Sequence, residues 1–310
     1  MTDPTRRMIL AALAAIWPAG LVRAQPVQTI TGPIPLDEGS DSYHIRRIRL
    51  PAQADGADHL IRVAWPRGPV PEAGFPVLCA LDGHAVAAEL DAARLAQLAR
   101  GLRPALILLG HDTETRFATL ERSRDYTPPA ANGASVIDPR GRAGGGAARY
   151  LALLRDAILP RAVALGPLDP ERITLWGHSY GGLFALHAAF AGGSPFAHHI
   201  AASPSLWWDE ARYFDRLMAR LAEGAAPRFM QTTPLTLHTG GAEHAPAPRK
   251  ADPQARALVK MRDALPDTAL RDLDRALRAA GVPGRLRVFA GLSHGEAFGQ
   301  SLRVALGLTA

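Results

Sequence analysis

The sequence predicts an α/β fold with a mostly parallel central sheet and helices on both faces. Short apolar runs alternate with longer segments of helical periodicity, as in proteins whose parallel strands are joined by crossover helices. Two of the runs, residues 76–81 and 105–109, are continuously apolar, which is typical of strands buried on both faces. A third observation is a serine between glycines at a predicted strand-to-helix junction, residues 177–181 (GHSYG).

The other elements follow from periodicity and turn residues. Strands are expected at residues 43–50, 59–65, 76–81, 105–109, 172–176, 199–202, 235–239 and 285–289. Helices are expected at residues 85–100, 144–165, 183–191, 209–221, 256–280 with a break near Pro266, and from residue 296 onward. Residues 111–145 are predicted to be a long irregular loop, a feature that in compact domains is usually functional or disordered.

Composition limits the classes of function. The chain has 310 residues, of which 47% are hydrophobic, so it can bury a sizeable core. The net charge of +6 is spread along the chain without a long basic run, which argues against a nucleic-acid-binding tail. The single cysteine, Cys79, lies in an apolar run and is expected to be an inert core thiol.

The first 24 residues have the pattern of a secretory signal peptide. Arg6 and Arg7 precede an apolar stretch that is too short to span a membrane, and small residues lead to Ala24. The paired arginines suggest the twin-arginine export route. We therefore expect a leader at residues 1–24 and a single exported domain at residues 25–310, without a membrane span and located in the periplasm or outside the cell.

The G-x-S-x-G pattern points to Ser179 as a nucleophile. A serine on a sharp turn between a strand and a helix projects its hydroxyl from the sheet, and flanking glycines let the neighbouring backbone approach closely. The strand is supplied by residues 173–176 and the helix by residues 182–186. The adjacent His178 is expected to point away from the nucleophile and to be structural.

A serine hydroxyl needs a base to attack at neutral pH. His294 follows the last predicted strand after a short loop, the place where this architecture supplies its catalytic histidine, and we predict that it is the base. An acid that orients the imidazole should follow the strand at residues 235–239. Glu243 is the candidate and Asp252 the alternative; a histidine–serine dyad without an acid also remains open.

Acyl transfer further needs donors for the oxyanion. One is expected to be the backbone N–H of Tyr180, directly after the nucleophile. The second is expected from the loop after an early strand, where Gly83 allows close approach of the backbone.

Together these segments resemble the putative-esterase family of the α/β-hydrolases, and within it the periplasmic siderophore esterases that cut enterobactin-type and salmochelin-type trilactones. The resemblance covers most of the chain from about residue 30 onward. It rests on the segments LDGHAV (81–86), RSRDYTP (122–128), GGG (144–146), WGHSYGGLF (176–184), ASPSLWW (202–208) and SHG (293–295).

The resemblance implies an α/β-hydrolase fold and a small-molecule ester as substrate, with a ferric catecholate siderophore as the candidate. It implies that Arg122 binds the catecholate end of the substrate; Trp207, Trp208 and His84 are further candidate substrate contacts. The family also contains feruloyl, acetyl-xylan and S-formylglutathione hydrolases, which share the serine motif and remain alternatives. A fold kept for binding without turnover is disfavoured by the intact serine and histidine. We expect no cofactor, metal or nucleic acid, because the sequence lacks HExxH, CxxC and phosphate-loop patterns.

Overall fold

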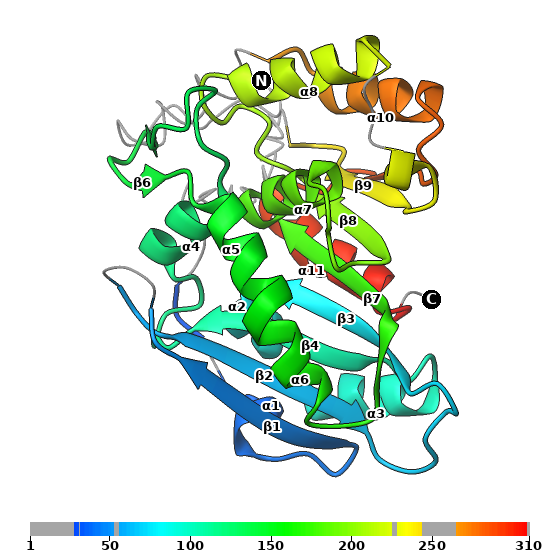
Figure 1. Cartoon of the computed structure of the whole chain (residues 1–310). Helices are drawn as coiled ribbons and strands as arrows, with labels where there is room; N and C mark the ends of the chain where they lie inside the picture. Colours follow the sequence, from blue (N-terminus) through cyan, green and yellow to red (C-terminus); the bar gives the residue numbers. More distant parts are fainter. Residues whose placement is uncertain (1–27, 31, 53–55, 225–227, 244–264, 309–310) are drawn as a thin grey trace, which may run out of the picture.

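The computed structural model describes residues 28–30, 32–52, 56–224, 228–243 and 265–308. Its centre is an eight-stranded sheet in the order β1-β2-β4-β3-β7-β8-β9-β10. The strands run parallel from β4 through β3, β7, β8 and β9 to β10. At the other end of the sheet, β2 is antiparallel to both of its neighbours, β1 and β4. Figure 1 shows this mixed sheet with helices on both sides, so the predicted fold class is confirmed.

The strands match their predicted positions closely. They are β1 (Tyr43–Leu50), β2 (His59–Pro66), β3 (Phe75–Leu81), β4 (Ala105–His111), β7 (Leu168–His178), β8 (His198–Ala202), β9 (Leu235–Gly240) and β10 (Leu286–Phe289). Strands β3 and β4 are almost completely buried, as their continuous apolar sequences predict. Cys79, in the middle of β3, is fully buried, and burial raises the pKa of its thiol.

The helices divide between two apolar layers. One layer contains α5 (Ala147–Leu153), α6 (Leu159–Val163), α7 (Tyr180–Phe190), α8 (Arg212–Ala222) and α10 (Ala269–Ala279). The other contains α2 (Gly83–Ala88), α3 (Ala92–Arg100) and α11 (His294–Ala305). The predicted helix over residues 85–100 is in fact two helices, because Asp91 caps α3 by accepting a hydrogen bond from the Arg94 backbone N–H.

The segment 111–145 is more ordered than predicted. It contains the helix α4 (Thr119–Tyr126) and a small hairpin of β5 (Val136–Ile137) and β6 (Ala143–Gly144). The helix α4 was not predicted from hydrophobic periodicity, because its buried side chains include Glu121, Ser123 and Asp125. A helix with a polar buried face gives no apolar stripe to detect.

Three expectations fall outside the described residues: the leader at residues 1–24, the alternative acid Asp252, and the first part of the helix expected over residues 256–280. Within the part of the chain that is described, none of the helices is both long and apolar enough to cross a membrane.

Candidate active site

Residues that follow the carboxyl ends of parallel strands meet at one edge of the sheet. Strand β3 is followed by Asp82 and Gly83, β7 by Ser179, and β8 by Ser203. Strands β9 and β10 lead to Glu243 and His294. The predicted nucleophile, base and acid therefore come from three strands of the same sheet.

Ser179 occupies a strained backbone conformation, with φ 60° and ψ −114°. Residues other than glycine rarely adopt a positive φ, and such strain is typical of a nucleophile held on a sharp turn. The turn requires Gly177, because a Cβ there would lie 2.3 Å from the Gly181 carbonyl oxygen. It also requires Gly182, where a Cβ would lie 2.5 Å from the Ala202 carbonyl oxygen and separate α7 from β8.

His294 and Glu243 form a histidine–carboxylate pair. The distance from His294 Nδ1 to Glu243 Oε2 is 3.1 Å, and the His294 side chain is 44% exposed while that of Glu243 is 11% exposed. The imidazole is thus held at one nitrogen and partly open to solvent. This is the arrangement in which an acid fixes the orientation of a general base.

Several donors keep Glu243 ionised. Its Oε1 accepts hydrogen bonds from Ser203 Oγ at 2.5 Å and from the Gly240 N–H at 2.6 Å. Burial alone would raise the pKa of Glu243, but the His294 charge and the hydrogen bonds from His294, Ser203 and Gly240 lower that pKa to about 2. The carboxylate is therefore negatively charged at every physiological pH.

Sequence reasoning missed the turn after β8. Ser203 has φ 44° and donates to Glu243, while Ser205 Oγ lies 3.2 Å from Ser179 Oγ. The backbone of this turn is also hydrogen-bonded to the backbone of Ser179. The Ser179 N–H donates to the Ala202 carbonyl, and the Ser205 N–H donates to the Ser179 carbonyl. One short turn thus contacts both the serine and the acid. The Ser-Pro-Ser sequence directly after a strand is the signal that could have indicated it.

Within the described residues, no hydrogen bond joins Ser179 to His294 directly; the contact between their segments is made by His178. The His178 ring lies 4.5 Å from the His294 ring, and its Nε2–H donates to the His294 carbonyl at 3.0 Å. His178 was expected to be structural, and these contacts with His294 agree with such a role. Burial, followed by the His294 charge, lowers the pKa of His178 well below its usual value, so a neutral ring supports the loop that carries His294.

Both predicted oxyanion donors lie at the first position of a helix, where a backbone N–H has no intrahelical acceptor. Tyr180 begins α7 and Gly83 begins α2. The structure gives a packing reason for the glycine: a Cβ on Gly83 would lie 2.9 Å from the backbone of Leu108 and Leu109. The close contact with β4 therefore requires glycine at position 83, independently of the proposed role of its N–H as an oxyanion donor.

Arg122 is already engaged by protein groups. Its Nε and Nη2 donate to the two carboxylate oxygens of Asp82 at 2.8 and 2.9 Å, and Nη2 also reaches the His178 carbonyl at 3.4 Å. Its side chain is only 12% exposed. In this structure Arg122 links the start of α2 to the residue before Ser179. Contact between Arg122 and the catecholate end of a substrate stays a prediction.

The other arginines of residues 111–145 are also engaged by protein groups. Arg116 pairs with Glu89, Arg124 with Asp125 and Arg142 with Asp138; Arg140 also makes interactions. The segment carrying these arginines is therefore stabilised by ion pairs.

The two tryptophans differ. Trp208 is 1% exposed and its Nε1–H donates to the Pro128 carbonyl, so the prediction that it contacts substrate is not supported, because its ring belongs to the core. Trp207 is half-buried, with its ring 5.7 Å from the Tyr180 ring. It is the tryptophan that has surface available beside the candidate oxyanion donor.

His84 lies in a different setting. Its Nε2 is 2.9 Å from Arg62 Nη2, and it lines a cavity of about 530 Å³ with residues of β1, β2 and the end of β4. The cavity wall carries both signs of charge, including Asp37 and Asp112. A substrate contact by His84 remains a prediction.

A strained serine at the carboxyl edge of a mostly parallel sheet, with a histidine–carboxylate pair at the same edge, is the arrangement of the α/β serine hydrolases. The family model described as "Putative esterase" matches residues 56–309, and the chain belongs to that family.

Named relatives support this class. The chain is 32% identical over 288 residues to the apo-salmochelin esterase of Escherichia coli O6:H1, covering 92% of this chain and 85% of the relative. It is 33% identical to the ferri-bacillibactin esterase BesA of Bacillus subtilis, over 48% of this chain and 54% of the relative. The solved structure of the enterobactin hydrolase IroE in complex with DFP superposes with a TM-score of 0.68 at 30% identity, covering 88% of this chain and 98% of that one.

Proposed function

We propose that this protein hydrolyses the ester bonds of a siderophore, with a trilactone of the enterobactin type as the best candidate substrate. The observation that carries the proposal is the His294–Glu243 pair at the sheet edge that also holds the strained Ser179. The named relatives, which act on salmochelin, bacillibactin and enterobactin, support the substrate class.

In the proposed mechanism, Ser179 Oγ attacks the ester carbonyl carbon while His294 accepts the hydroxyl proton. The backbone N–H groups of Tyr180 and Gly83 stabilise the negative oxygen of the tetrahedral intermediate. His294 then protonates the departing alcohol, leaving an acyl-enzyme. A water molecule, deprotonated by His294, attacks the acyl-enzyme and releases the carboxylic acid, and Glu243 stabilises the imidazolium in both halves.

The proposed substrate contacts are chosen from the predicted side chains that keep exposed surface in the structure. Trp207 is the proposed aromatic wall, because a catechol ring can stack on an indole. Arg122 is proposed to act on the substrate indirectly, by fixing Asp82 and the His178 carbonyl. The basic net charge would raise the local concentration of an anionic siderophore.

The proposed place of action is the periplasm or the outside of the cell, with residues 1–24 as the leader and residues 25–310 as one domain. The support is the arginine-led apolar sequence itself. N-terminal sequencing of exported protein tests it: a chain that begins near Gln25 agrees with export, and an uncleaved Met1 does not.

The test of function compares a triscatecholate trilactone with a short-chain aryl acetate, with products identified by mass spectrometry. Wild type should cleave the lactone to linear and monomeric products, and Ser179→Ala should lose at least about 10³-fold in kcat on both substrates. Ser194→Ala is the matched control, because Ser194 precedes β8 at the opposite end of that strand from Ser203. Cleavage of the acetate without the lactone would remove the siderophore assignment and leave a general esterase.

Two further variants separate the substrate contacts. Trp207→Ala should reduce kcat/KM for the lactone by about 10-fold and barely affect the acetate, because only the lactone carries catechol rings, and the acetate has just its small aryl leaving group. Arg122→Ala should reduce kcat/KM alike for both substrates, because Arg122 contacts Asp82 at the start of α2 and the His178 carbonyl in the turn before the nucleophile. A loss confined to the lactone would instead favour direct contact between Arg122 and the catecholate.

A further inference from the structure

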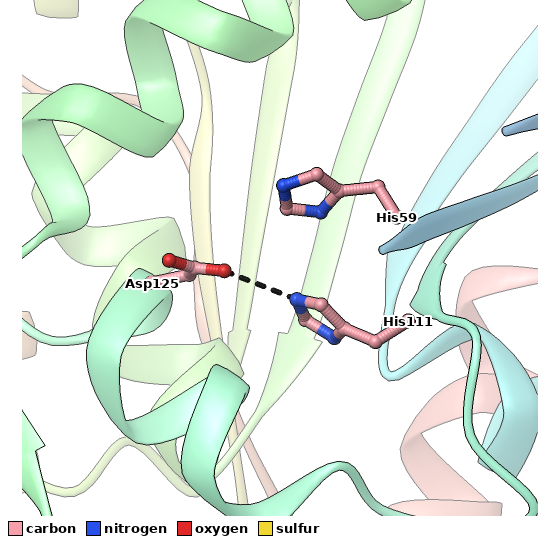
Figure 2. Close-up of side chains that lie close together, drawn as sticks. All are labelled: His59, His111 and Asp125. Carbon is pink, nitrogen blue, oxygen red and sulfur yellow. Dashed lines mark hydrogen bonds and ion pairs between the residues drawn. The ribbon is translucent and has the colours of Figure 1, made fainter. Parts of the chain in front are cut away.

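A second cluster of ionisable side chains lies at the antiparallel end of the sheet. His59 on β2 and His111 on β4 are directly opposite each other in the strand register, and residues paired in this way project from the same face. Asp125 comes to them from α4. Figure 2 shows the three side chains converging on one point.

The dimensions of the cluster suit a single ion. One ligand atom from each of His59, His111 and Asp125 lies within 4.8 Å of the other two. The His111 and His59 rings are 5.1 Å apart, and His111 Nε2 is 3.0 Å from Asp125 Oδ2. Two imidazole nitrogens and one carboxylate oxygen around a common centre are a recurrent ligand set for zinc and other first-row divalent metals.

The cluster also contains an unsatisfied atom. His59 is 2% exposed, and within the described part of the chain its Nδ1 has no hydrogen-bond partner. A buried polar nitrogen without a partner costs free energy and requires an explanation. The proton now shared between His111 and Asp125 cannot also reach His59, whereas a metal ion between all three would bind one nitrogen of each ring together with the carboxylate.

The surroundings hold the carboxylate in place. Arg124 donates to both oxygens of Asp125, at 2.7 and 2.9 Å, which orients Oδ2 toward His111 as a neighbouring donor orients a metal-bound carboxylate. The positive charge of Arg124 opposes a cation, but the charge of Glu121 also acts on Arg124 and offsets part of it. Asp125 and Glu121 together therefore supply two negative charges against one guanidinium.

We propose that His59, His111 and Asp125 form a buried binding site for a divalent transition metal, best fitted by Zn²⁺. The ion would join β2, β4 and α4, and three protein ligands leave a coordination position for water. Because α4 also carries Arg122, the metal would stabilise the helix that supports the turn before Ser179. The role assigned to the ion is structural and involves no step of ester hydrolysis.

The test uses the full exported chain without a histidine tag. After treatment with a chelator and dialysis, the protein is incubated with ZnCl₂, desalted, and its zinc content measured by mass spectrometry. Wild type should retain about one zinc per chain and gain roughly 4–8 °C in Tm at zinc concentrations about 100-fold above Kd. MgCl₂ should give no shift, because magnesium prefers oxygen ligands.

Two variants and a control make the test specific. His59→Leu should retain zinc at less than a fifth of the wild-type level and lose the zinc-dependent shift in Tm, yet still fold, because the lost Nδ1 has no hydrogen-bond partner. Asp125→Asn should also lose the shift. His199→Gln is the control: His199 is equally buried but hydrogen-bonded to Ser194 outside the cluster, so its zinc content should match that of wild type.

An anomalous-scattering peak at the zinc edge between the three side chains would locate the ion. Wild type that retains no zinc and shows no shift in Tm overturns the proposal, as does zinc retention that is equal in wild type and His59→Leu. Neither result bears on the esterase activity, which the Ser179→Ala comparison tests separately.

Discussion

The described part of the chain contains two histidine–carboxylate pairs of nearly equal length in very different surroundings. His294 Nδ1 lies 3.1 Å from Glu243, and His111 Nε2 lies 3.0 Å from Asp125. The His294 side chain is 44% exposed, whereas that of His111 is 2% exposed. The first pair stands at the carboxyl edge of the sheet near a strained serine, and the second stands beside another buried histidine and an arginine.

The difference teaches that a histidine–carboxylate contact does not by itself define a function. The pair can act as a base only where the other imidazole nitrogen is open to a substrate or nucleophile. Where the histidine is enclosed and faces a further ligand-type nitrogen, the same contact is suited to hold a metal or a packing arrangement. The exposure of the histidine and the group that its ring faces therefore decide whether the pair serves as a base or as a metal or packing site.

The strongest test of the comparison replaces the two histidines. His294→Ala should reduce kcat by about 10³-fold or more, because the proposed base is lost. His111→Ala should mainly lower the free energy of unfolding. In fully folded protein, its fold-loss of kcat should be at least 100-fold smaller than that of His294→Ala. Steady-state kinetics and urea unfolding of both variants check this. Similar kinetic losses would mean that the two pairs are functionally coupled.

Replacing the two acids should separate activity from stability. Glu243→Gln keeps the size of the side chain but removes the charge that stabilises the imidazolium, so kcat should fall on the order of 10²-fold. Asp125→Asn removes the carboxylate that accepts both hydrogen bonds from Arg124 and should cost roughly 2–4 kcal/mol in stability. Unchanged kinetics in Glu243→Gln would favour a dyad, or Asp252 as the acid.

The depressed pKa of Glu243 makes stability depend on pH. Its pKa falls from 4.5 to about 2 on folding, so its stabilising contribution is present above pH 4.5 and is lost as pH falls toward 2. Between pH 5 and pH 3 the wild type should lose about 2 kcal/mol more than Glu243→Gln. Urea unfolding at the two pH values measures this difference, and parallel losses would show that Glu243 does not gain charge stabilisation on folding.

The smallest expected effect concerns Ser203, which acts only through Glu243. Ser203→Ala removes the hydrogen bond to Oε1 and should lower kcat by about 10-fold with little change in KM. The positive φ of Ser203 calls for a backbone control, and Ser203→Gly removes the hydroxyl while tolerating that φ. Equal losses in both variants identify the hydrogen bond; a loss in Ala alone identifies backbone strain.

Local patterns explain what the sequence could predict. The strands, Ser179 and His294 could be located because each is marked by a short contiguous signal: an apolar run, a glycine-flanked serine, or a histidine just after the last strand. Glu243 could be predicted from the order of the elements alone, because parallel strands bring their carboxyl ends together. The roles of these three residues remain predictions until the variants are measured.

Long-range pairing explains what the sequence could not predict. Arg122 was expected to bind the catecholate end of the substrate, and its ion pair with Asp82 could not be predicted, because Asp82 lies 40 positions earlier and meets it only in the folded chain. The cluster of His59, His111 and Asp125 depends on the register between two antiparallel strands, which no local pattern encodes. Trp208 was misjudged because adjacent tryptophans look alike in sequence, although one becomes core and the other stays half-buried.

The outermost strands of the sheet have a consequence for self-association. Strands β1 and β10 each present one row of backbone groups that has no neighbour within the described sheet, and such rows can recruit a strand from another molecule. Exposed arginines stand on both, Arg46 on β1 and Arg287 on β10, whereas Arg47 and Arg49 of β1 are paired with Asp37 and Asp112. Two copies approaching edge to edge would bring guanidinium groups together, so charge repulsion at both ends of the sheet should keep concentrated solutions from forming extended strand-to-strand aggregates.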